Sequence, residues 1–354
     1  MNNGVLSNTS NTRKYYPGID LLKFIMSLVV VAIHVKPFET SSVLFRLFSP
    51  LFQSAVPVFF LCSSFLLFNK IASNSNRVVG ESGGKLRVVF HFISRIGLLY
   101  LVWFVIDLPF IIANKGYFKE FGILESIGVF IKDLFLGTTF PGSWFLSALV
   151  VSVIIVFGFS RWIGDALTFV LALLVYVYVT GQDFIPENWQ GLYNWYSQNV
   201  RKEVYNSFPF ALVWVAMGAC SSSNWYKRIV NSISRNTTLL WLCFGITYLL
   251  MVAYPKFASL LVLLLVPTLF EIGKTIRLES SNKWKFLREA SILIFLFHFS
   301  IAGKKDLFLD FVGNYSLVYH LVFYIIVVMI SFMFASCILL LEKNKFFRLL
   351  KYLH

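Results

Sequence analysis

The chain has 354 residues, of which 58% are hydrophobic and only 14% are charged, and its mean hydropathy is +0.74. Soluble proteins carry about 25% charged residues, so this composition excludes an ordinary soluble domain and predicts an integral membrane protein. A formal net charge of +14 would suggest a nucleic-acid partner in a soluble chain. Here the Lys and Arg residues lie in short segments between apolar runs. Membrane topology therefore explains the charge, and we expect no nucleic-acid partner.

Residues 1–18 are polar and have no signal-peptide architecture, so we expect the first apolar run to be retained as a helix. That run contains four polar side chains, Asp20, Lys23, Ser27 and His34. Their spacing of three, four and seven residues places them on one stripe of a helix. Lys23 and His34 are almost three turns apart, roughly 16 Å along the helix axis.

A Lys and a His on one intramembrane stripe usually face a water-filled cavity, because burying an ionisable side chain in lipid costs free energy. The alternative is that Lys23 snorkels to the headgroups and His34 caps the far end of the helix. The four cysteines are scattered through apolar runs without metal-binding spacing. We interpret them as small hydrophobic residues and expect no disulfide framework and no metal.

Ten apolar runs are long enough to span a bilayer, near residues 19–36, 50–68, 90–113, 144–160, 165–181, 207–221, 238–254, 258–274, 288–303 and 317–341. Segment 121–137 carries two acids and a lysine, which favours an interfacial or re-entrant helix. The longest piece between runs, 182–206, is too short for a soluble domain. The sequence predicts an all-α membrane protein of about ten transmembrane helices, with 1–354 as a single domain.

The orientation follows from the distribution of Lys and Arg. With both termini in the cytoplasm, the inner segments hold about twice as many of these residues as the outer segments. We therefore predict a multi-pass protein of the cytoplasmic membrane, with a short cytoplasmic tail at 1–17 and a basic one at 342–354. Lys23 then lies near the inner leaflet, and His34 lies near the outer surface.

Several segments resemble acyltransferase family 3, a family of membrane-bound transferases. The order of Asp20, Lys23 and His34 is similar to its opening pattern of aspartate, two residues, a basic residue, ten residues and histidine. The resemblance continues through the whole chain, in PVFFLCSSFLLF (57–68), Arg95 followed by Tyr100, SWFL (143–146), SFPFALVWVAMG (207–218) and SILIFLFHFS (291–300).

Three positions depart from the family pattern. Lys23 stands where arginine is commoner, and Phe92 leaves Arg95 without the usual second arginine. Ser64 stands where the family usually has glycine, so a close backbone approach there is less assured.

The resemblance implies transfer of an acetyl group, or another acyl group, from acyl-CoA to a hydroxyl of a surface polysaccharide or its lipid-linked precursor. The bundle then surrounds a cavity where donor and acceptor meet. Histidine suits the activation of a hydroxyl, with an ordinary pKa near 6.5, which makes His34 the candidate catalytic residue. A covalent acyl-histidine intermediate is the alternative. The phosphates of acetyl-CoA are expected to meet four basic side chains on the inner side, Lys23, Lys85, Arg87 and Arg95.

The supporting residues implied by the matched motifs are Asp20, Ser63, Ser64, Tyr100, Trp144 and His298. Some have simpler explanations. The two serines are often helix-packing hydroxyls, Trp144 is at an interface where Trp is common, and His298 among Phe and Leu in mid-membrane is equally a structural histidine. Glu271 is an intramembrane acid that Lys274 is placed to pair with.

A second class of function is a polysaccharide exporter, flippase or polymerase without acyl chemistry. A polymerase would have a large basic outer loop, whereas 182–206 contains only Arg201 and Lys202. An exporter would usually carry charge pairs along several helices. This chain concentrates its polar residues in the first helix, which favours the transferase.

Overall fold

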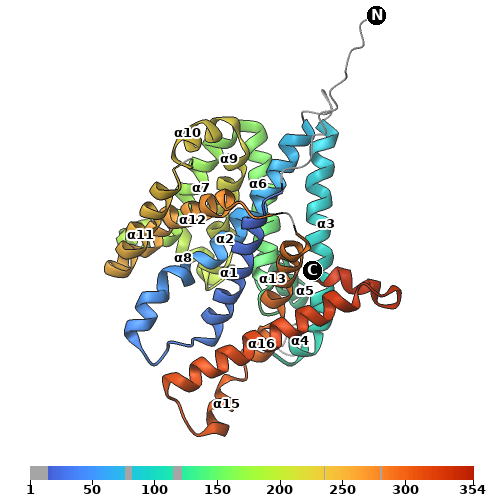
Figure 1. The fold of residues 1–354 in the computed structure, drawn as a ribbon. Helices are drawn as coiled ribbons and strands as arrows, with labels where there is room; N and C mark the ends of the chain where they lie inside the picture. The colour runs from blue at the N-terminus through green and yellow to red at the C-terminus, as the bar shows by residue number, and fades with distance from the viewer. Residues whose placement is uncertain (1–14, 76–81, 115–121, 235, 280) are drawn as a thin grey trace, which may run out of the picture.

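The computed structural model describes residues 15–75, 82–114, 122–234, 236–279 and 281–354, and within these ranges it contains helices and no strand. The all-α prediction is therefore confirmed for the described part. Figure 1 shows how the α-helices of the described residues are arranged. They are α1 Pro17–Val35, α2 Ser42–Ser75, α3 Ser82–Ile106, α4 Leu108–Asn114, α5 Ile123–Phe135, α6 Ser143–Ile163, α7 Asp165–Thr180, α8 Gly191–Asn199, α9 Phe208–Ser222, α10 Asn224–Ser234, α11 Thr237–Ala253, α12 Ala258–Thr275, α13 Asn282–Phe297, α14 Phe299–Ala302, α15 Lys305–Val312 and α16 Leu317–Leu341.

Among the described residues, six helices are long and apolar enough to cross a membrane, namely α1, α2, α3, α6, α12 and α16. A seventh span is possible if the segment from α13 to α15, which is bent by 51°, counts as one. Three further predicted runs form the shorter apolar helices α7, α9 and α11. Each predicted run thus falls on helical structure, while the number of ten spans stays a prediction.

The segments between the predicted spans also carry structure. Segment 121–137, which was predicted as an interfacial or re-entrant helix, contains α5. Segment 182–206 contains α8 and three short 3-10 turns. The tail after α16 forms a 3-10 segment, Lys345–Leu353, and Trp103 Nε1 donates a hydrogen bond to the Leu353 carbonyl at 3.1 Å. Of the predicted N-terminal tail, residues 1–14 lie outside the described residues.

Helix α1 lies at the centre of the bundle and packs against α2, α12, α13 and α16. Pro17 occupies its first turn, where a missing N–H leaves no intrahelical bond unmade. Gly18 lets α1 and α12 approach closely, because a Cβ at this position would lie 2.1 Å from the Gly273 carbonyl oxygen. Two glycines thus hold the start of α1 against α12.

A close approach also joins α2 to α9, at Ser64. The Ser64 side chain is fully buried and donates its hydroxyl hydrogen to the Phe60 carbonyl of its own helix at 2.8 Å. The missing Cβ is on the other helix, since a Cβ at Gly218 would lie 2.0 Å from Ser64 Oγ. The family pattern has a glycine at position 64, which would allow α2 and α9 to approach closely. In this chain position 64 is serine, and Gly218 on α9 allows the same close approach.

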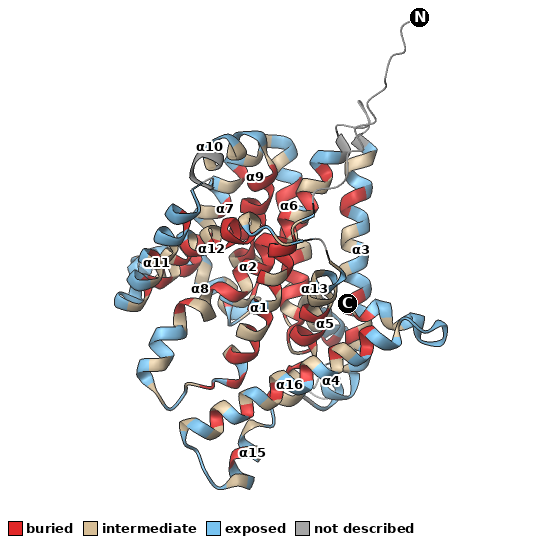
Figure 2. Cartoon of the chain, viewed as in Figure 1, coloured by how far each residue is buried: buried red, intermediate tan, exposed pale blue. Residues whose placement is uncertain are grey.

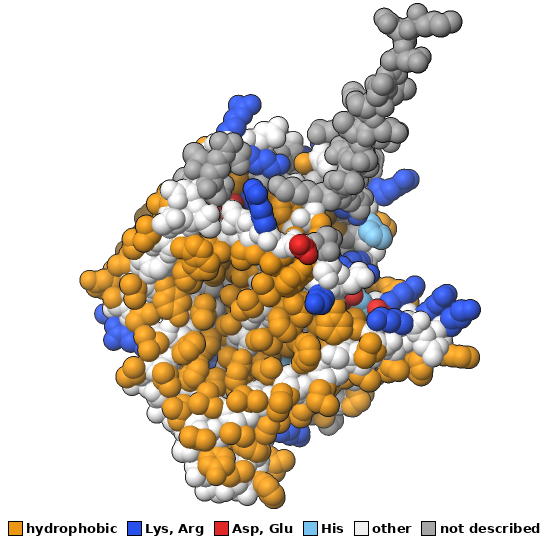
Figure 3. Space-filling view, in the orientation of Figure 1, with side chains coloured by type: hydrophobic (Ala, Val, Ile, Leu, Met, Phe, Trp, Pro, Cys, Tyr) orange, Lys and Arg blue, Asp and Glu red, His pale blue; other side chains and the backbone are white. Residues whose placement is uncertain are grey.

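Burial differs strongly between the helices (Figure 2). Nearly every residue of α9 is buried, which makes it a core helix that is apolar on all sides. Helices α3 and α16 are the least buried of the long apolar helices, with 22% of an 18-residue stretch of each buried. Figure 3 shows a broad band of hydrophobic side chains across one face, with Lys and Arg side chains mostly at its margins. An exposed apolar band of this kind is the surface expected next to lipid.

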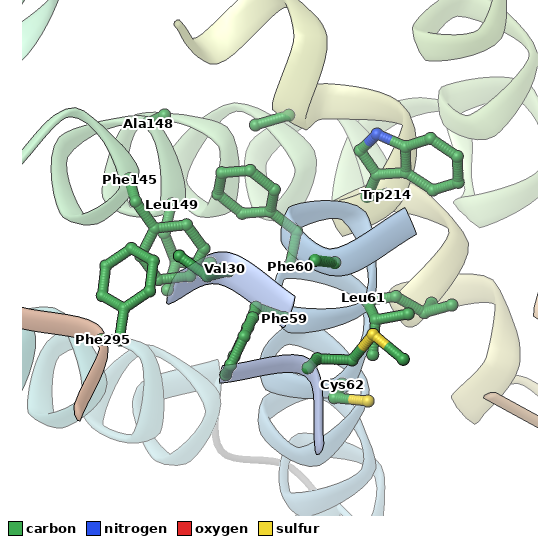
Figure 4. Packing of buried hydrophobic residues seen from close by; sticks show 14 of the residues in the cluster. Val30, Phe59, Phe60, Leu61, Cys62, Phe145, Ala148, Leu149, Trp214 and Phe295 are labelled. Carbon is green, nitrogen blue, oxygen red and sulfur yellow. The ribbon is translucent and has the colours of Figure 1, made fainter. Parts of the chain in front are cut away.

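Phenylalanine rings fill the core between α2, α6 and α13 (Figure 4). The ring centroids of Phe60 and Phe145 lie 4.6 Å apart, and those of Phe145 and Phe295 lie 5.1 Å apart. Phe59 joins the same cluster at 5.8 Å from Phe295. Aromatic pairs at these separations stabilise a core beyond their burial alone. The cluster fixes α6 and α13 relative to α2, and the candidate site lies at the end of α13.

Candidate functional site

The polar stripe of α1 has two different ends. Asp20, Lys23 and Ser27 are buried, with 3%, 7% and 0% of their surface exposed. His34 lies in the last turn and is exposed in the structure. We call these the Lys23 end and the His34 end of α1. The helical spacing places them roughly 16 Å apart along the axis, as the sequence predicts.

A cavity of about 340 Å³ opens at the Lys23 end. It lies between α1, α2, α3 and α13, and basic side chains dominate its polar lining. The cationic residues that line it are Lys23, Lys70, Arg95 and Arg288. Glu289 is the acidic residue of the lining. Lys23 is buried and lines the cavity, and no ion pair within 4 Å involves it in the described part of the chain. A cavity of this charge suits an anionic ligand.

The cavity contains some of the basic residues expected from the sequence, but not all of them. Lys23 and Arg95 line it, and Ser63 lines it as well. Lys85 and Arg87, in the first turns of α3, do not line it, and Arg87 is exposed elsewhere on that helix. These two residues belong to the helix end, where basic side chains anchor a helix at the membrane surface.

Two cavity cations were not predicted, Lys70 at the end of α2 and Arg288 near the start of α13. In the sequence both stand beside apolar runs, where the positive-inside rule already accounts for them. No signal in the sequence separates them from the other anchoring residues. Arg288 also links α13 to the opening motif, since its NH1 atom lies 3.9 Å from Asp20 Oδ2. Asp20 thus faces a neighbouring helix and lies outside the cavity lining.

A second histidine lies beside the His34 end. The ring centroids of His34 and His298 are 5.2 Å apart. Phe299 contacts both rings, at 4.4 Å from His34 and 4.1 Å from His298. His298 is the residue between α13 and α14, and its φ and ψ are helical. The packing of α13 against α1 brings the two rings together.

The hydrogen bonds of His298 determine its neutral tautomer. Its Nδ1 atom lies 3.0 Å from the Ile294 carbonyl oxygen, which can only accept a hydrogen bond. Nδ1 therefore carries the hydrogen, and Nε2 is left with a lone pair. Nε2 is fully buried and has no hydrogen-bond partner among the described residues. A buried acceptor without a donor is uncommon and costs free energy, which makes this atom a candidate partner for a donated proton.

The loop before α6 closes the other side of the histidine pair. Gly142 adopts φ +82°, and a Cβ there would lie 2.8 Å from the Phe299 ring. Trp144, one of the predicted supporting residues, follows in the first turn of α6, and its ring lies 6.2 Å from Phe60. The SWFL segment thus packs beside the site without contacting His34 in the described contacts. Gly142 is the residue that brings the loop against Phe299.

Three other predicted residues lie away from the two ends. Tyr100 shares a hydrogen bond of 2.6 Å with Thr139 and so fixes the loop before α6. Ser64 packs against α9, as described above. Lys274 donates to Glu271 at 2.7 Å, which confirms that pair as an ion pair. Tyr226 also donates to Glu271, at 3.2 Å, so this carboxylate is held in a structural network.

The fold and the two ends of α1 define a class, a multi-pass membrane protein with a cationic cavity at one end of a central helix and a histidine pair at the other. The chain belongs to acyltransferase family 3, because the family's acyltransferase domain matches residues 16–352. This match confirms the resemblance seen in the opening motif and the later helices.

The curated relatives that match are longer proteins, and they are named as racemases. A serine/alanine racemase of Enterococcus gallinarum is 25% identical over 352 residues, which cover 94% of this chain and 47% of that protein. An amino-acid racemase of Enterococcus faecalis is 30% identical over 167 residues, 46% of this chain and 21% of that protein. The chain spans less than half the length of these relatives. No solved structure matches it.

Proposed function

We propose that this protein moves an acyl group, acetyl or a longer one, from cytoplasmic acyl-CoA to a hydroxyl of a surface glycan or its lipid-linked precursor. In this proposal the protein lies in the cytoplasmic membrane with both termini inside. The Lys23 end then faces the cytoplasm, and the His34 end faces the outer surface. The donor enters from one side of the bilayer, and the acceptor is bound on the other.

The observation that carries the proposal is the separation of charge and histidines along α1. The nucleotide of acyl-CoA is anionic, and the cavity at the Lys23 end presents four basic side chains. The pantetheine arm is a chain of low charge that can extend along the stripe toward His34. The distance of roughly 16 Å between the two residues is on the scale of that arm. Neither substrate then has to cross the membrane.

The chemistry assigned to the histidines is proton transfer to and from oxygen. The acceptor hydroxyl attacks the thioester carbonyl, an ester C–O bond forms and the C–S bond breaks. His34 takes the hydroxyl proton, and the proton ends on the thiolate of released CoA. If His34 first accepts the acyl group itself, the ester forms in a second step. The Nε2 atom of His298, which carries no hydrogen, is then the base that takes the proton of the acceptor hydroxyl.

The experiment that tests the function uses a deletion strain and its complemented derivatives. The surface glycan is compared by NMR in the deletion strain, in the strain carrying the wild-type gene and in the strain carrying His34→Ala. We expect one acyl ester signal to be lost in the deletion, restored by wild type and not restored by His34→Ala. An unchanged acylation pattern together with an altered amount or length of glycan would favour an exporter or a polymerase instead.

A second candidate function follows from the match to a protein named serine/alanine racemase, which extends over 94% of this chain. In that case the protein would bind serine or alanine, with the amino acid at the His34 end. Conversion of L-serine or L-alanine to the D enantiomer by membranes that contain the protein tests this candidate. Conversion that requires His34, without any acyl ester in the glycan, would favour it over acyl transfer.

A further inference from the structure

The 3-10 segment Lys345–Leu353 begins shortly after α16, one of the long apolar helices, ends at Leu341. The chain turns there and returns to α3 (Figure 1), where Trp103 Nε1 donates a hydrogen bond to the Leu353 carbonyl at 3.1 Å. His354 follows and lines the cationic cavity, and its Nε2 atom lies 2.7 Å from Glu342 Oε2. The segment is therefore fixed between the end of a candidate membrane span and one wall of the cavity.

The side chains of this segment separate by the side on which they lie. A 3-10 helix has three residues per turn, so residues three apart lie on one side. From residue 348 onward the inner side carries Leu350 and Leu353, the second side carries Leu349 and Tyr352, and the third side carries Arg348 and Lys351. Leu353 is only 6% exposed, whereas Leu349 is 76% exposed. In the turn before them Phe346 is 91% exposed. The outer surface of the segment is thus partly apolar and partly basic.

The basic side chains of this region point outward without acidic partners. They are Lys343, Lys345, Arg348 and Lys351, and all four are exposed. Among the described residues none of the four forms an ion pair, and none lines the cationic cavity. The acid of the same region, Glu342, pairs with His354 instead. The segment therefore presents uncompensated positive charge on its outer surface.

Membrane topology accounts for these charges but not for the apolar side chains among them. The positive-inside rule needs Lys and Arg near the end of a span, and it requires nothing of their neighbours. Phe346 and Leu349 stand exposed between the basic residues. The interface of an anionic membrane suits both kinds of side chain, because apolar groups enter the boundary of the acyl chains while Lys and Arg attract the lipid phosphates.

We infer that the Lys345–Leu353 segment lies on the membrane surface and binds the headgroups of anionic phospholipids. Phe346 and Leu349 then enter the apolar boundary beside the end of α16, and the basic side chains contact lipid phosphates. The bound lipid holds the segment in place, and with it the part of the cavity wall that His354 forms. This inference goes beyond the proposed function and does not depend on the reaction at His34.

The test identifies the lipid that lies against the segment. Benzoylphenylalanine replaces Phe346 as a photoreactive probe, at a side chain that packs on nothing in the protein and so is free to be changed. The purified chain is placed in nanodiscs that contain equal amounts of phosphatidylcholine and phosphatidylglycerol, and its lipid adducts are identified by mass spectrometry after illumination. We expect about fivefold more adducts with phosphatidylglycerol, the effect of one basic side chain near an anionic surface. Added salt should lower this excess.

Two triple variants separate the segment from the net charge of the chain. Lys345→Gln, Arg348→Gln and Lys351→Gln together should bring the ratio of the two adducts close to one. The matched control removes three exposed basic residues that lie elsewhere on the same predicted side of the membrane, by Arg228→Gln, Arg277→Gln and Lys283→Gln. It should keep the excess of phosphatidylglycerol. In phosphatidylcholine alone the two variants should bind CoA equally, because neither set of residues lines the cavity.

Three results would overturn the inference. The first is an equal number of adducts with both lipids in the chain that keeps its basic residues, or no lipid adduct at all. The second is an equal loss of the excess in both triple variants, which would show that net charge alone attracts phosphatidylglycerol. The third is weaker CoA binding in the variant of the segment but not in the control, which would assign these basic residues to the phosphates of the donor.

Discussion

The imidazole rings of His34 and His298 lie side by side at the end of α1, with centroids 5.2 Å apart, although 264 positions separate them in the sequence. Among the described residues, the ring of His298 has a backbone hydrogen bond, from Nδ1 to the Ile294 carbonyl, and the ring of His34 has none. Its free Nε2 is an acceptor and cannot donate while the ring is neutral. The two rings therefore differ in environment, since His34 is exposed and His298 is buried.

His34→Ala should abolish acyl transfer and leave expression and acyl-CoA binding nearly intact. Loss of a general base typically lowers a rate about 10²–10⁴-fold, whereas loss of a covalent carrier should be complete. His34→Gln keeps a hydrogen bond but cannot take the proton, so it should be equally inactive. The measurement is acyl transfer by purified variants, with acyl-CoA binding as the control. Activity at a tenth of the wild-type rate in His34→Ala would make this residue structural.

His298→Asn separates the two nitrogen atoms of His298. The Asn side-chain NH₂ can still donate to the Ile294 carbonyl, while the acceptor at the Nε2 position is removed. We expect kcat to fall about 10²-fold, within the range for loss of a proton-accepting group, with unchanged acyl-CoA affinity and thermal stability. The matched variant His298→Gln places an amide near the Nε2 position and should retain more activity. An unchanged kcat in His298→Asn would mean that His298 contributes to packing and not to proton transfer.

Lys23→Arg should keep much of the activity, because arginine retains the charge at the cavity. Lys23→Ala should raise the Kd for acyl-CoA if the ammonium group meets the donor. The same loss is expected for Arg95→Gln, because a charge-assisted hydrogen bond contributes about 1.5–3 kcal/mol, or about tenfold or more in affinity. Titration calorimetry with acyl-CoA measures both.

Arg87→Gln is the matched control for Arg95→Gln, since it removes the same charge from the same helix outside the cavity lining. It should bind acyl-CoA like the wild type. Equal weakening in both variants would indicate a general electrostatic effect of α3, and unchanged binding in Lys23→Ala would return Lys23 to a snorkelling role.

Gly218→Val should destabilise the bundle, because its Cβ would lie 2.0 Å from Ser64 Oγ and 2.7 Å from the Phe65 backbone nitrogen. Overpacking of this kind typically costs about 1–3 kcal/mol. The thermal unfolding temperature in detergent should fall, and Ser64→Gly should restore part of the loss in Gly218→Ala. Gly245→Val, at a glycine with open space on α11, should have little effect by comparison. Similar unfolding temperatures for the two Val variants would contradict the close approach of α2 and α9.

Cysteine labelling tests the orientation. In a background without the native cysteines, Gln198→Cys on α8 should react with a membrane-impermeant maleimide in intact cells. Glu279→Cys, between α12 and α13, should react only after the cells are opened. Both side chains are exposed in the structure. The reverse pattern would invert the orientation and place the His34 end in the cytoplasm.

The sequence by itself determined the helices and the stripe on α1. Hydrophobic runs and the period of 3.6 residues are local properties, so the register of Lys23 and His34 follows without knowledge of any neighbour. The order of Asp20, Lys23 and His34 also indicated the family to which the chain belongs. Positive-inside counting, in contrast, could not separate Lys70 and Arg288 at the cavity from Arg87 outside it, because all three lie beside apolar runs.

Tertiary structure decided which residues meet those on α1. His298 reaches His34 only because α13 packs on α1, and Gly218 lies against Ser64 only because α9 packs on α2. Each of these contacts joins helices far apart in the chain. The fit of side chains between neighbouring helices selects such pairs, since lipid offers every apolar face an equally favourable environment and hydrophobicity alone does not choose a partner.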